Sequence, residues 1–457
     1  MAAGDFTFGT PSIFDSSQVF YPVLDKVDDN KFSISWADNS FAMKTVIGEN
    51  TNLSPTYGVK QTLTTSGQFN ISAANINTTS FINVFEDRTT ITQTLAQIAS
   101  VSGNTITLNT SVVVEGLNPV SIQVVAMSDT TGVIATNPLS SGNLNLYPYS
   151  ISGTVITIHS PTTHSTGAGN FGQIRNGHGI CKIDADRFAV VLSNTNSGGR
   201  AECLVGQLAA NSITLGNLDV FDFGNTSEIS VVATGIDTFV ATYILGSGTY
   251  SCVFDVIGLN PQGATPQVIP SPVFNPSQVD VVYVSDGLVC ITQFQSQQIV
   301  QNLAYVTGST LTHYPYSAKN LGGTAVSSTL SSQLISEDVV AVAYKDEPNS
   351  GYGGLLLSSV ELPQNSFSYS TSGALVVDAT STSKLIPKFT HSSFGNLLVS
   401  GASTNSYRTR YIYSTSGLLN LQGSAITVFE PEIEYLGRQV RASSVLVENI
   451  FGNSSIR

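Results

Sequence analysis

Short apolar stretches alternate with polar turns along most of the chain, and the clearest set lies in residues 177–222. Ile180–Ile183 ends a first apolar stretch, Phe188–Leu192 is a second, Ala201–Leu208 alternates, and Ser212–Phe221 is a fourth. Runs of this length, separated by turns rich in Asp, Asn and Gly, predict four short β-strands. One such sheet cannot bury both of its faces alone, so we expect it to stack against similar sheets.

The same four-strand pattern recurs along the chain, with a period of roughly 45–55 residues that is typical of propeller blades. Eight sections follow it, at residues 19–66, 69–116, 119–166, 177–222, 227–274, 278–319, 325–378 and 384–429. No stretch carries apolar residues at helical spacing over three turns, so the pattern predicts an all-β fold. We expect one repeat domain over residues 1–430 and a C-terminal extension over residues 431–457.

The first residues carry a strand that lacks a sheet of its own. Residues 6–15, FTFGTPSIFD, match the fourth-strand segment ITLGNLDVFD at residues 213–222, and no first three strands precede them. Propellers commonly close their ring when a strand from one terminus completes the blade built by the other. We therefore expect residues 6–15 to be the ring-closing strand, paired with the eighth section. If they displace AITVFE at residues 425–430, the ring has seven blades instead of eight.

The segments KVDDNKFSISWAD, KIDADRFAVVLSN, NTITLNTSVVV and NSITLGNLDVF show the repeated turn and strand pattern most clearly. On these segments the chain resembles β-propeller repeat proteins over about residues 6–430. The resemblance implies four-stranded blades, eight or alternatively seven, arranged in a ring. The chain lacks the Trp-Asp ending of WD40 blades and the regular paired glycines of kelch blades. The resemblance therefore implies no functional residues.

The amino-acid composition limits the kinds of molecule that the chain is expected to bind. Only 11% of the 457 residues are charged, and the formal net charge is −13. This acidic balance lacks the basic footprint that binding to nucleic acid needs, and it disfavours an anionic membrane surface. The chain starts without the pattern of a secretory signal, and no apolar run reaches the length of a membrane span. Few lysines and many Ser, Thr and Asn give it a composition similar to that of bacteriophage and other virion structural proteins.

These features predict a non-enzymatic structural or attachment component of a virion, such as a phage tail or capsid appendage, synthesised in the host cytoplasm. The expected partners are other virion proteins in a symmetric assembly, and a host-surface glycan or receptor. The alternative is a propeller lectin or a glycan-processing enzyme, which would place carboxylates or aromatic residues at the mouth of the channel.

Candidate chemistry is sparse. Asp184 and Asp186 leave the calcium-loop pattern D-x-D-x-D-G incomplete, so they predict a hairpin turn and no metal site. Patterns for a serine nucleophile, a zinc-binding helix or a phosphate-binding loop are missing. We predict no catalytic, cofactor-binding or metal-binding residue. The cysteines are expected to be buried free thiols, and they are Cys181, Cys203, Cys252 and Cys290.

Six residues are predicted to bind a partner, and they are Arg175, His178, Tyr314, Tyr316, Arg438 and Arg441. His178 stands between two glycines, the two tyrosines flank a proline in a predicted outer strand, and the last two arginines belong to the C-terminal extension. Exposed tyrosines beside Asn and Ser suit contact with a carbohydrate or a protein. The same outer strands equally allow their aromatic side chains to pack between blades.

Overall fold

The structure is a computed structural model that divides the chain into two compact units, residues 1–361 and 362–457. It describes residues 4–362 apart from 68–69, 90, 118, 139–142, 166–178, 195–198, 223, 225, 236, 271–275, 286, 296–297, 322–329 and 347–349. In the second unit it describes the backbone of eight strands between residues 364 and 442. Every regular element among the described residues is a β-strand.

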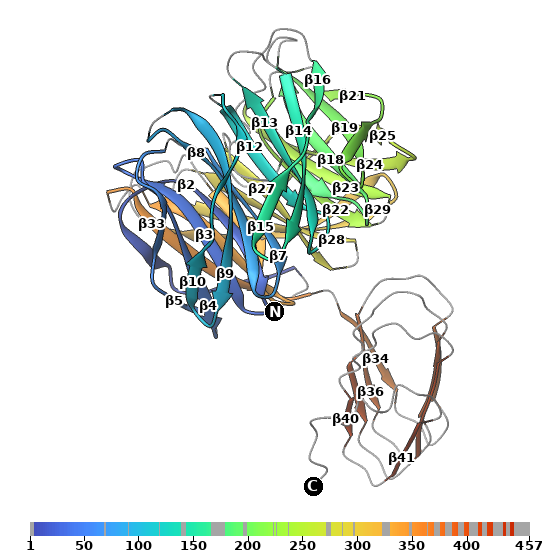
Figure 1. Cartoon of the computed structure of the whole chain (residues 1–457). Helices are drawn as coiled ribbons and strands as arrows, with labels where there is room; N and C mark the ends of the chain where they lie inside the picture. The colour runs from blue at the N-terminus through green and yellow to red at the C-terminus, as the bar shows by residue number, and fades with distance from the viewer. Residues whose placement is uncertain are drawn as a thin grey trace. The chain divides into compact units, whose positions relative to one another are not determined.

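The strands of the first unit form antiparallel sheets that follow one another along the chain (Figure 1). Blade 1 consists of β2 (Ser12–Asp28), β3 (Lys31–Asp38), β4 (Met43–Thr51), β5 (Ser54–Tyr57) and β6 (Gln61–Thr64). Blade 2 consists of β7 (Ile71–Asn77), β8 (Ser80–Asp87), β9 (Gln93–Ser102), β10 (Thr105–Leu108) and β11 (Val112–Glu115). Blade 3 consists of β12 (Pro119–Ala126), β13 (Thr131–Pro138), β14 (Asn143–Ser152), β15 (Val155–Ile158) and β16 (Thr162–Ser165). Blades 4 and 5 are β17 (Ile180–Lys182), β18 (Arg187–Asn194), β19 (Arg200–Ala209), β20 (Ser212–Leu215) and β21 (Asp219–Asp222); β22 (Thr226–Gly235), β23 (Thr238–Leu245), β24 (Gly248–Ile257), β25 (Asn260–Gly263) and β26 (Gln267–Val268). Blades 6 and 7 are β27 (Gln278–Ser285), β28 (Leu288–Gln295), β29 (Gln298–Thr307) and β30 (Thr310–Asn320); β31 (Leu330–Leu334), β32 (Val339–Asp346) and β33 (Tyr352–Val360), with β1 (Phe6–Phe8).

The first strands of these blades form a closed ring. Each lies beside the first strand of the next blade, in the order β2, β7, β12, β17, β22, β27, β31 and back to β2. The fold is therefore the predicted β-propeller, and the ring that the described strands form has seven blades. The preferred number of eight is wrong, because seven first strands already complete the circle.

The ring-closing strand is where the sequence predicted it, but its partner differs. Phe6 pairs with Val360 of β33, and the start of β2 continues along the same strand with Ser12 opposite Leu355. The N-terminal strand thus completes the blade built from residues 330–360, and not a section at 384–429. A strand from the chain start gives the last blade its missing edge.

Packing between neighbouring sheets makes the core. The second strand of a blade shows how: in β18, Phe188, Val190 and Leu192 face blade 3, whereas Ala189 and Val191 face blade 5. Successive side chains of a strand point to opposite faces, so one apolar strand supplies two interfaces. This explains why the second strands read as continuous apolar runs.

Polar side chains link the first strands around the ring. Backbone N–H groups of Leu24, Val124, Val281 and Ser332 donate hydrogen bonds to the side chains of Ser331, Ser72, Ser230 and Asp280, respectively. In each case the acceptor belongs to the preceding blade and is buried. A first strand has no strand partner on its inner edge, so these bonds satisfy N–H groups that the sheet leaves open.

The second unit has a different construction. Strands β34 (Gln364–Tyr369), β36 (Ile386–His391), β38 (Arg410–Tyr413) and β40 (Ile433–Tyr435) form one parallel sheet, and β35 (Leu375–Ala379), β37 (Leu397–Gly401), β39 (Leu418–Gly423) and β41 (Gln439–Ala442) form another. Gln364 pairs with Ile386, and Leu375 pairs with Leu397, so a step of 22 residues adds one strand to each sheet, except that the last step, from Leu418 to Gln439, is 21 residues. This is the construction of a β-solenoid.

The parallel sheets of the second unit correct two predictions. The propeller does not extend to residue 430, and residues 384–429 do not form an eighth blade. The compact propeller unit ends at Glu361, and the described strands within residues 384–429 pair in parallel. Parallel neighbours cannot be joined by the tight hairpins of a blade, because the chain must return to the same end of the sheet. Residues 431–457 are not a separate extension either, since β40 and β41 pair with β38 and β39.

Candidate functional site

The six predicted binding residues do not come together among the described residues. Arg175, His178 and Arg438 lie outside the described part of the chain. Arg441 belongs to β41, where only the backbone is described. Their roles in binding stay predictions.

Tyr314 and Tyr316 lie in the outer strand β30 and have different surroundings. Tyr316 is 44% exposed. Tyr314 packs against the backbone of Gly4, where an added Cβ atom would lie 2.6 Å from the Cβ of Tyr314. Burial, with a smaller effect of the neighbouring Tyr305, raises the pKa of Tyr314. Tyr314 therefore supports ring closure, whereas the side chain of Tyr316 is exposed and can contact a partner.

The Tyr-Pro-Tyr segment of blade 3 is structural. Tyr147 and Tyr149 are buried in the cluster that joins blades 2 and 3. The hydroxyl of Tyr147 donates a hydrogen bond to the buried carboxylate of Glu115, which also accepts bonds from Thr136 and Asn145. Both residues lie in β14, the third strand of its blade, and they pack between blades as the packing interpretation of such aromatic residues predicts.

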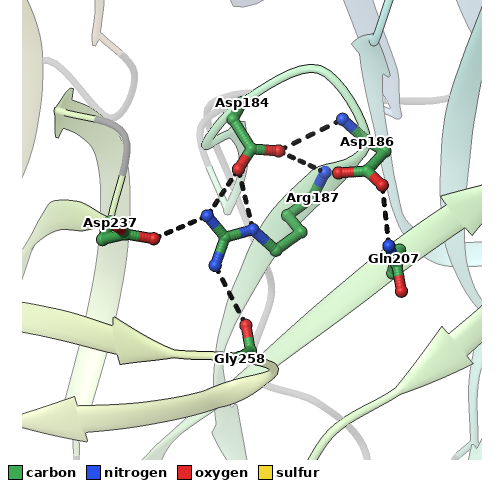
Figure 2. Close-up of polar contacts among 6 residues, drawn as sticks. All are labelled: Asp184, Asp186, Arg187, Gln207, Asp237 and Gly258. Atoms are coloured by element: carbon green, nitrogen blue, oxygen red, sulfur yellow. Dashed lines mark hydrogen bonds and ion pairs between the residues drawn. The ribbon is translucent and has the colours of Figure 1, made fainter.

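The turn at Asp184 forms a latch between blades 4 and 5 (Figure 2). One oxygen of Asp184 accepts hydrogen bonds from the backbone N–H groups of Asp186 and Arg187, at 3.1 and 2.9 Å. Its other oxygen pairs with the guanidinium of Arg187, which also reaches Asp237 and the carbonyl of Gly258 in blade 5. The carboxylate of Asp184 therefore shapes a turn and holds an arginine, as the turn interpretation predicted.

A more site-like group lies at the other end of β18, between blades 3 and 4. We call it the 3–4 polar cluster, and its members are Asn137, His164, Asn194, Arg200 and Glu202. The cluster extends the apolar interface between the two blades. Val133 and Ala135 face blade 4, and Asn137 lies on the same face of β13 because side chains two positions apart on a strand point the same way. His164 pairs with Leu144 of the same interface. Glu202 lies opposite Leu192, and Arg200 lies opposite Asn194, on the face that meets blade 3.

Glu202 is the centre of this cluster. Its side chain is fully buried, and both carboxylate oxygens accept hydrogen bonds from the Asn194 amide at 3.1 Å. Arg200 donates a further hydrogen bond to Glu202 at 3.1 Å, while its own side chain is 32% exposed. In blade 2 the residue in the same register as Glu202 is Leu95, opposite Phe85. Blade 4 thus buries a charge where a sister blade buries an apolar side chain.

Two atoms of the 3–4 polar cluster lack a hydrogen-bond partner. One is the Oδ1 atom of Asn137, whose residue is 1% exposed, and the other is Nε of Arg200. The amide nitrogen of Asn137 donates to the carbonyl of Asn143, which leaves Oδ1 as the open acceptor. Both atoms are closed to solvent, so each is a buried polar group for which the described residues supply no hydrogen bond.

Burial lowers the pKa of His164, and the Glu202 carboxylate opposes only part of that change. Burial also lowers the pKa of His313 in blade 6. Both imidazoles therefore take up protons less readily in the folded chain than in the unfolded chain, whose histidines have a pKa of about 6.5. The stability that the neutral forms of these two histidines contribute is fully present above the unfolded pKa of about 6.5, and this contribution is lost as the pH falls below that value.

The thermal unfolding midpoint is accordingly expected to fall between about pH 7 and about pH 5. The double variant with His164→Gln and His313→Gln is expected to have an unfolding midpoint that depends less on pH. Each single variant should remove part of this pH dependence. Calorimetry at several pH values is the measurement. A pH profile of the double variant that is parallel to that of the natural chain would show that other groups cause the loss.

Only one position of the 3–4 polar cluster is recognisable from the sequence alone. Among the alternating positions of residues 200–208, Glu202 lies on the same face as Leu204 and Leu208, so an acid stands on the face that packs in the core. Asn137 and His164 become recognisable only when the sheet register is known.

Other chemistry is limited among the described residues. They include no group of three or more His, Cys, Asp or Glu placed to hold a metal ion. A helix of the length and hydropathy needed to span a membrane is also missing from them. The predicted burial of the four cysteines is confirmed, and burial raises the pKa of Cys181, Cys252 and Cys290 to about 12.

No family model matches the sequence, and no curated protein matches it. Solved structures do match at low identity. They include a protein of unknown function from Dyadobacter fermentans, with 8% identity, a TM-score of 0.45 and coverage of 78% of this chain and 99% of that chain. A mutant of the Aleuria aurantia lectin in complex with Fucα1-6GlcNAc has 13% identity and a TM-score of 0.42, covering 68% of this chain and 99% of that chain. A Hadza microbial sialidase has 8% identity and a TM-score of 0.42, covering 76% and 68%. At these identities and TM-scores, no ligand or activity transfers to this chain.

Proposed function

We propose that this chain is a non-enzymatic binding protein whose propeller recognises a molecule on a host surface, as an attachment component of a virion. The observation that carries the binding role is the 3–4 polar cluster, which buries the carboxylate of Glu202 in a register that blade 2 fills with Leu95. Burying a charge where an apolar side chain would fit generally costs stability even when the charge is paired, and such departures from pattern concentrate at functional sites.

Two further observations support the placement on a virion. The surface chemistry is mostly uncharged, since 11% of all residues are charged, and this limits non-specific adhesion. The second unit repeats every 22 residues in parallel ladders, and such a repeat extends in one dimension, as a spacer next to a binding domain does. The chain would then work with other virion proteins and a host-surface glycan or receptor.

The test has two arms. Immunogold labelling with antibodies against the propeller should mark particles purified from cultures that produce this chain, and the purified chain should bind the surface of host cells. Cell binding without labelled particles would favour the second candidate, a free propeller lectin, which the same cluster supports. Release of sugar from host glycans by the purified chain would instead show an enzyme, and failure to bind cells would remove the recognition role.

A further inference from the structure

We propose that the last strands of the second unit join two copies of this chain, with β40 of one copy beside β41 of the other. The partner is therefore a second copy of the same chain, related to the first by a two-fold axis. This association involves strands that the recognition role does not use, and it does not depend on that role.

The two ladders of the second unit end in open edges. Each coil of the chain adds one strand to each sheet, so β40 and β41 are the last strands of their sheets and belong to the same end of the unit. No described strand pairs with the outer edge of either one. An edge strand presents a row of backbone N–H and C=O groups on which a further strand can add. A second copy can therefore extend both sheets at this end.

Charge distinguishes these two strands from the strands before them. Glu434 of β40 continues a register column whose other members are Ser368, Thr390 and Ile412. Arg441 of β41 continues a column whose other members are Val376, Leu398 and Asn420. In both columns the last strand alone is charged, and the two charges have opposite signs. A charge of one sign on both edges would keep a second copy away, whereas opposite charges make the edges complementary.

This charge pattern selects one way of joining two copies. A two-fold axis that exchanges the two sheets places β40 beside β41 of the partner, so the strand with Glu434 meets the strand with Arg441 twice. An axis that keeps each sheet in line with itself would place β40 beside β40, and like charges on adjacent strands are unfavourable. Head-to-tail joining would continue the columns with Ser368 and Val376, so neither charge would meet its opposite.

The joint lies at the end of the ladders where the chain does not enter. The propeller unit ends at Glu361, and β34 begins at Gln364. β40 is three strands away from β34, which is about 14 Å at a spacing of about 4.8 Å per strand. A pair of copies would carry two propellers, and two linked binding sites hold a surface more firmly than one. This last consequence alone rests on the recognition role proposed above.

Analytical ultracentrifugation of the full chain at micromolar concentrations is expected to show a monomer–dimer equilibrium. Glu434→Lys and Arg441→Glu each bring like charges together at both symmetric contacts, so each should weaken the dimer at least about tenfold. The matched control is Lys388→Glu, a charge reversal in the inner strand β36, which has a strand on both sides. It should leave the dissociation constant within about twofold of that of the natural chain.

Mixing the two reversed variants is the decisive measurement. A copy with Glu434→Lys and a copy with Arg441→Glu have opposite charges at both contacts, so the mixture should form a heterodimer within about threefold of the natural affinity. Contacts inside one copy cannot produce this rescue, because neither variant changes on mixing. A mixture that stays as weak as its components would overturn the proposed arrangement.

The remaining outcomes also decide. A natural chain that stays monomeric overturns the association, and a dimer that both reversals leave unchanged overturns its site. Oligomers that keep growing with concentration would show head-to-tail joining instead. A monomer that dimerises only when residues 443–457 are removed would show that the chain's own end occupies the edge, which rejects a second copy there. Should a reversal unfold the unit, Glu434→Gln and Arg441→Gln replace it: each should still weaken the dimer, and an unchanged dimer rejects the contact.

Discussion

Replacing Asp280 with alanine is expected to lower the free energy of unfolding by about 4 kcal/mol. Asp280 is fully buried at the inner edge of blade 6. Its carboxylate accepts hydrogen bonds from the Ser230 hydroxyl of blade 5, and from both the backbone N–H and the hydroxyl of Ser332 in blade 7. One side chain therefore joins three blades, and its removal leaves buried donors without their acceptor.

The ring supplies its own control for this variant. Ser72 occupies the same register in blade 2 and accepts one hydrogen bond, from the N–H of Val124. Ser72→Ala should cost about 1 kcal/mol, and Asp280→Ser should fall between the two because serine can still serve one neighbour. Chemical denaturation monitored by tryptophan fluorescence and circular dichroism measures all three. Equal losses for Asp280→Ala and Ser72→Ala would mean that the carboxylate adds nothing to an ordinary ring contact.

The blades were predictable because the information for each one is local. A turn with Asp or Asn, followed by an apolar strand of eight residues, marks the second strand wherever it occurs, as in Lys31–Asp38 and Arg187–Asn194. Six of the eight predicted sections coincide with blades of the structure for this reason. Ring size is different, because it depends on how many sheets close a circle, and no single segment encodes that packing.

The second unit was misread although its period is visible. Gly373, Gly395 and Gly417 recur every 22 residues, with an apolar pair following each glycine closely. A period of about 48 residues, carried over from the propeller, assigned these stretches to blades seven and eight. The shorter period is incompatible with four antiparallel strands per repeat, since 22 residues hold only two strands and their connections.

The candidate site lay mostly beyond sequence reasoning because it forms across an interface. The prediction weighed tyrosines and arginines by residue type, and Tyr314 proved to be partly covered by the chain start. Glu202 carried a usable signal, an acid in an apolar register, whereas Asn137 and His164 gain meaning only from the strands opposite them. Buried polar residues in continuous apolar strands are the signal to seek in such repeats.

The other large effect concerns ring closure. Deleting residues 1–9 removes β1 and is expected to lower the free energy of unfolding by at least about 5 kcal/mol. The deletion loses the burial of Phe6, the ladder from Phe6 opposite Val360 to Phe8, and the backbone bond from Gly9 to Leu357. It also leaves the outer edge of β33 open, so the variant should aggregate more readily.

Deletion of residues 362–457 is the matched control for the closing strand. It removes a longer segment, but no described strand of the propeller pairs with a described strand of the second unit. The propeller transition should therefore stay within about 1 kcal/mol of that of the full chain, while the deletion of residues 1–9 shifts it strongly. Hydrogen exchange gives the local readout, because the amides of β33 should lose protection first when β1 is absent. If β33 exchanged as slowly without β1 as with it, the ring would have to be held shut by the start of β2, where Ser12 lies opposite Leu355.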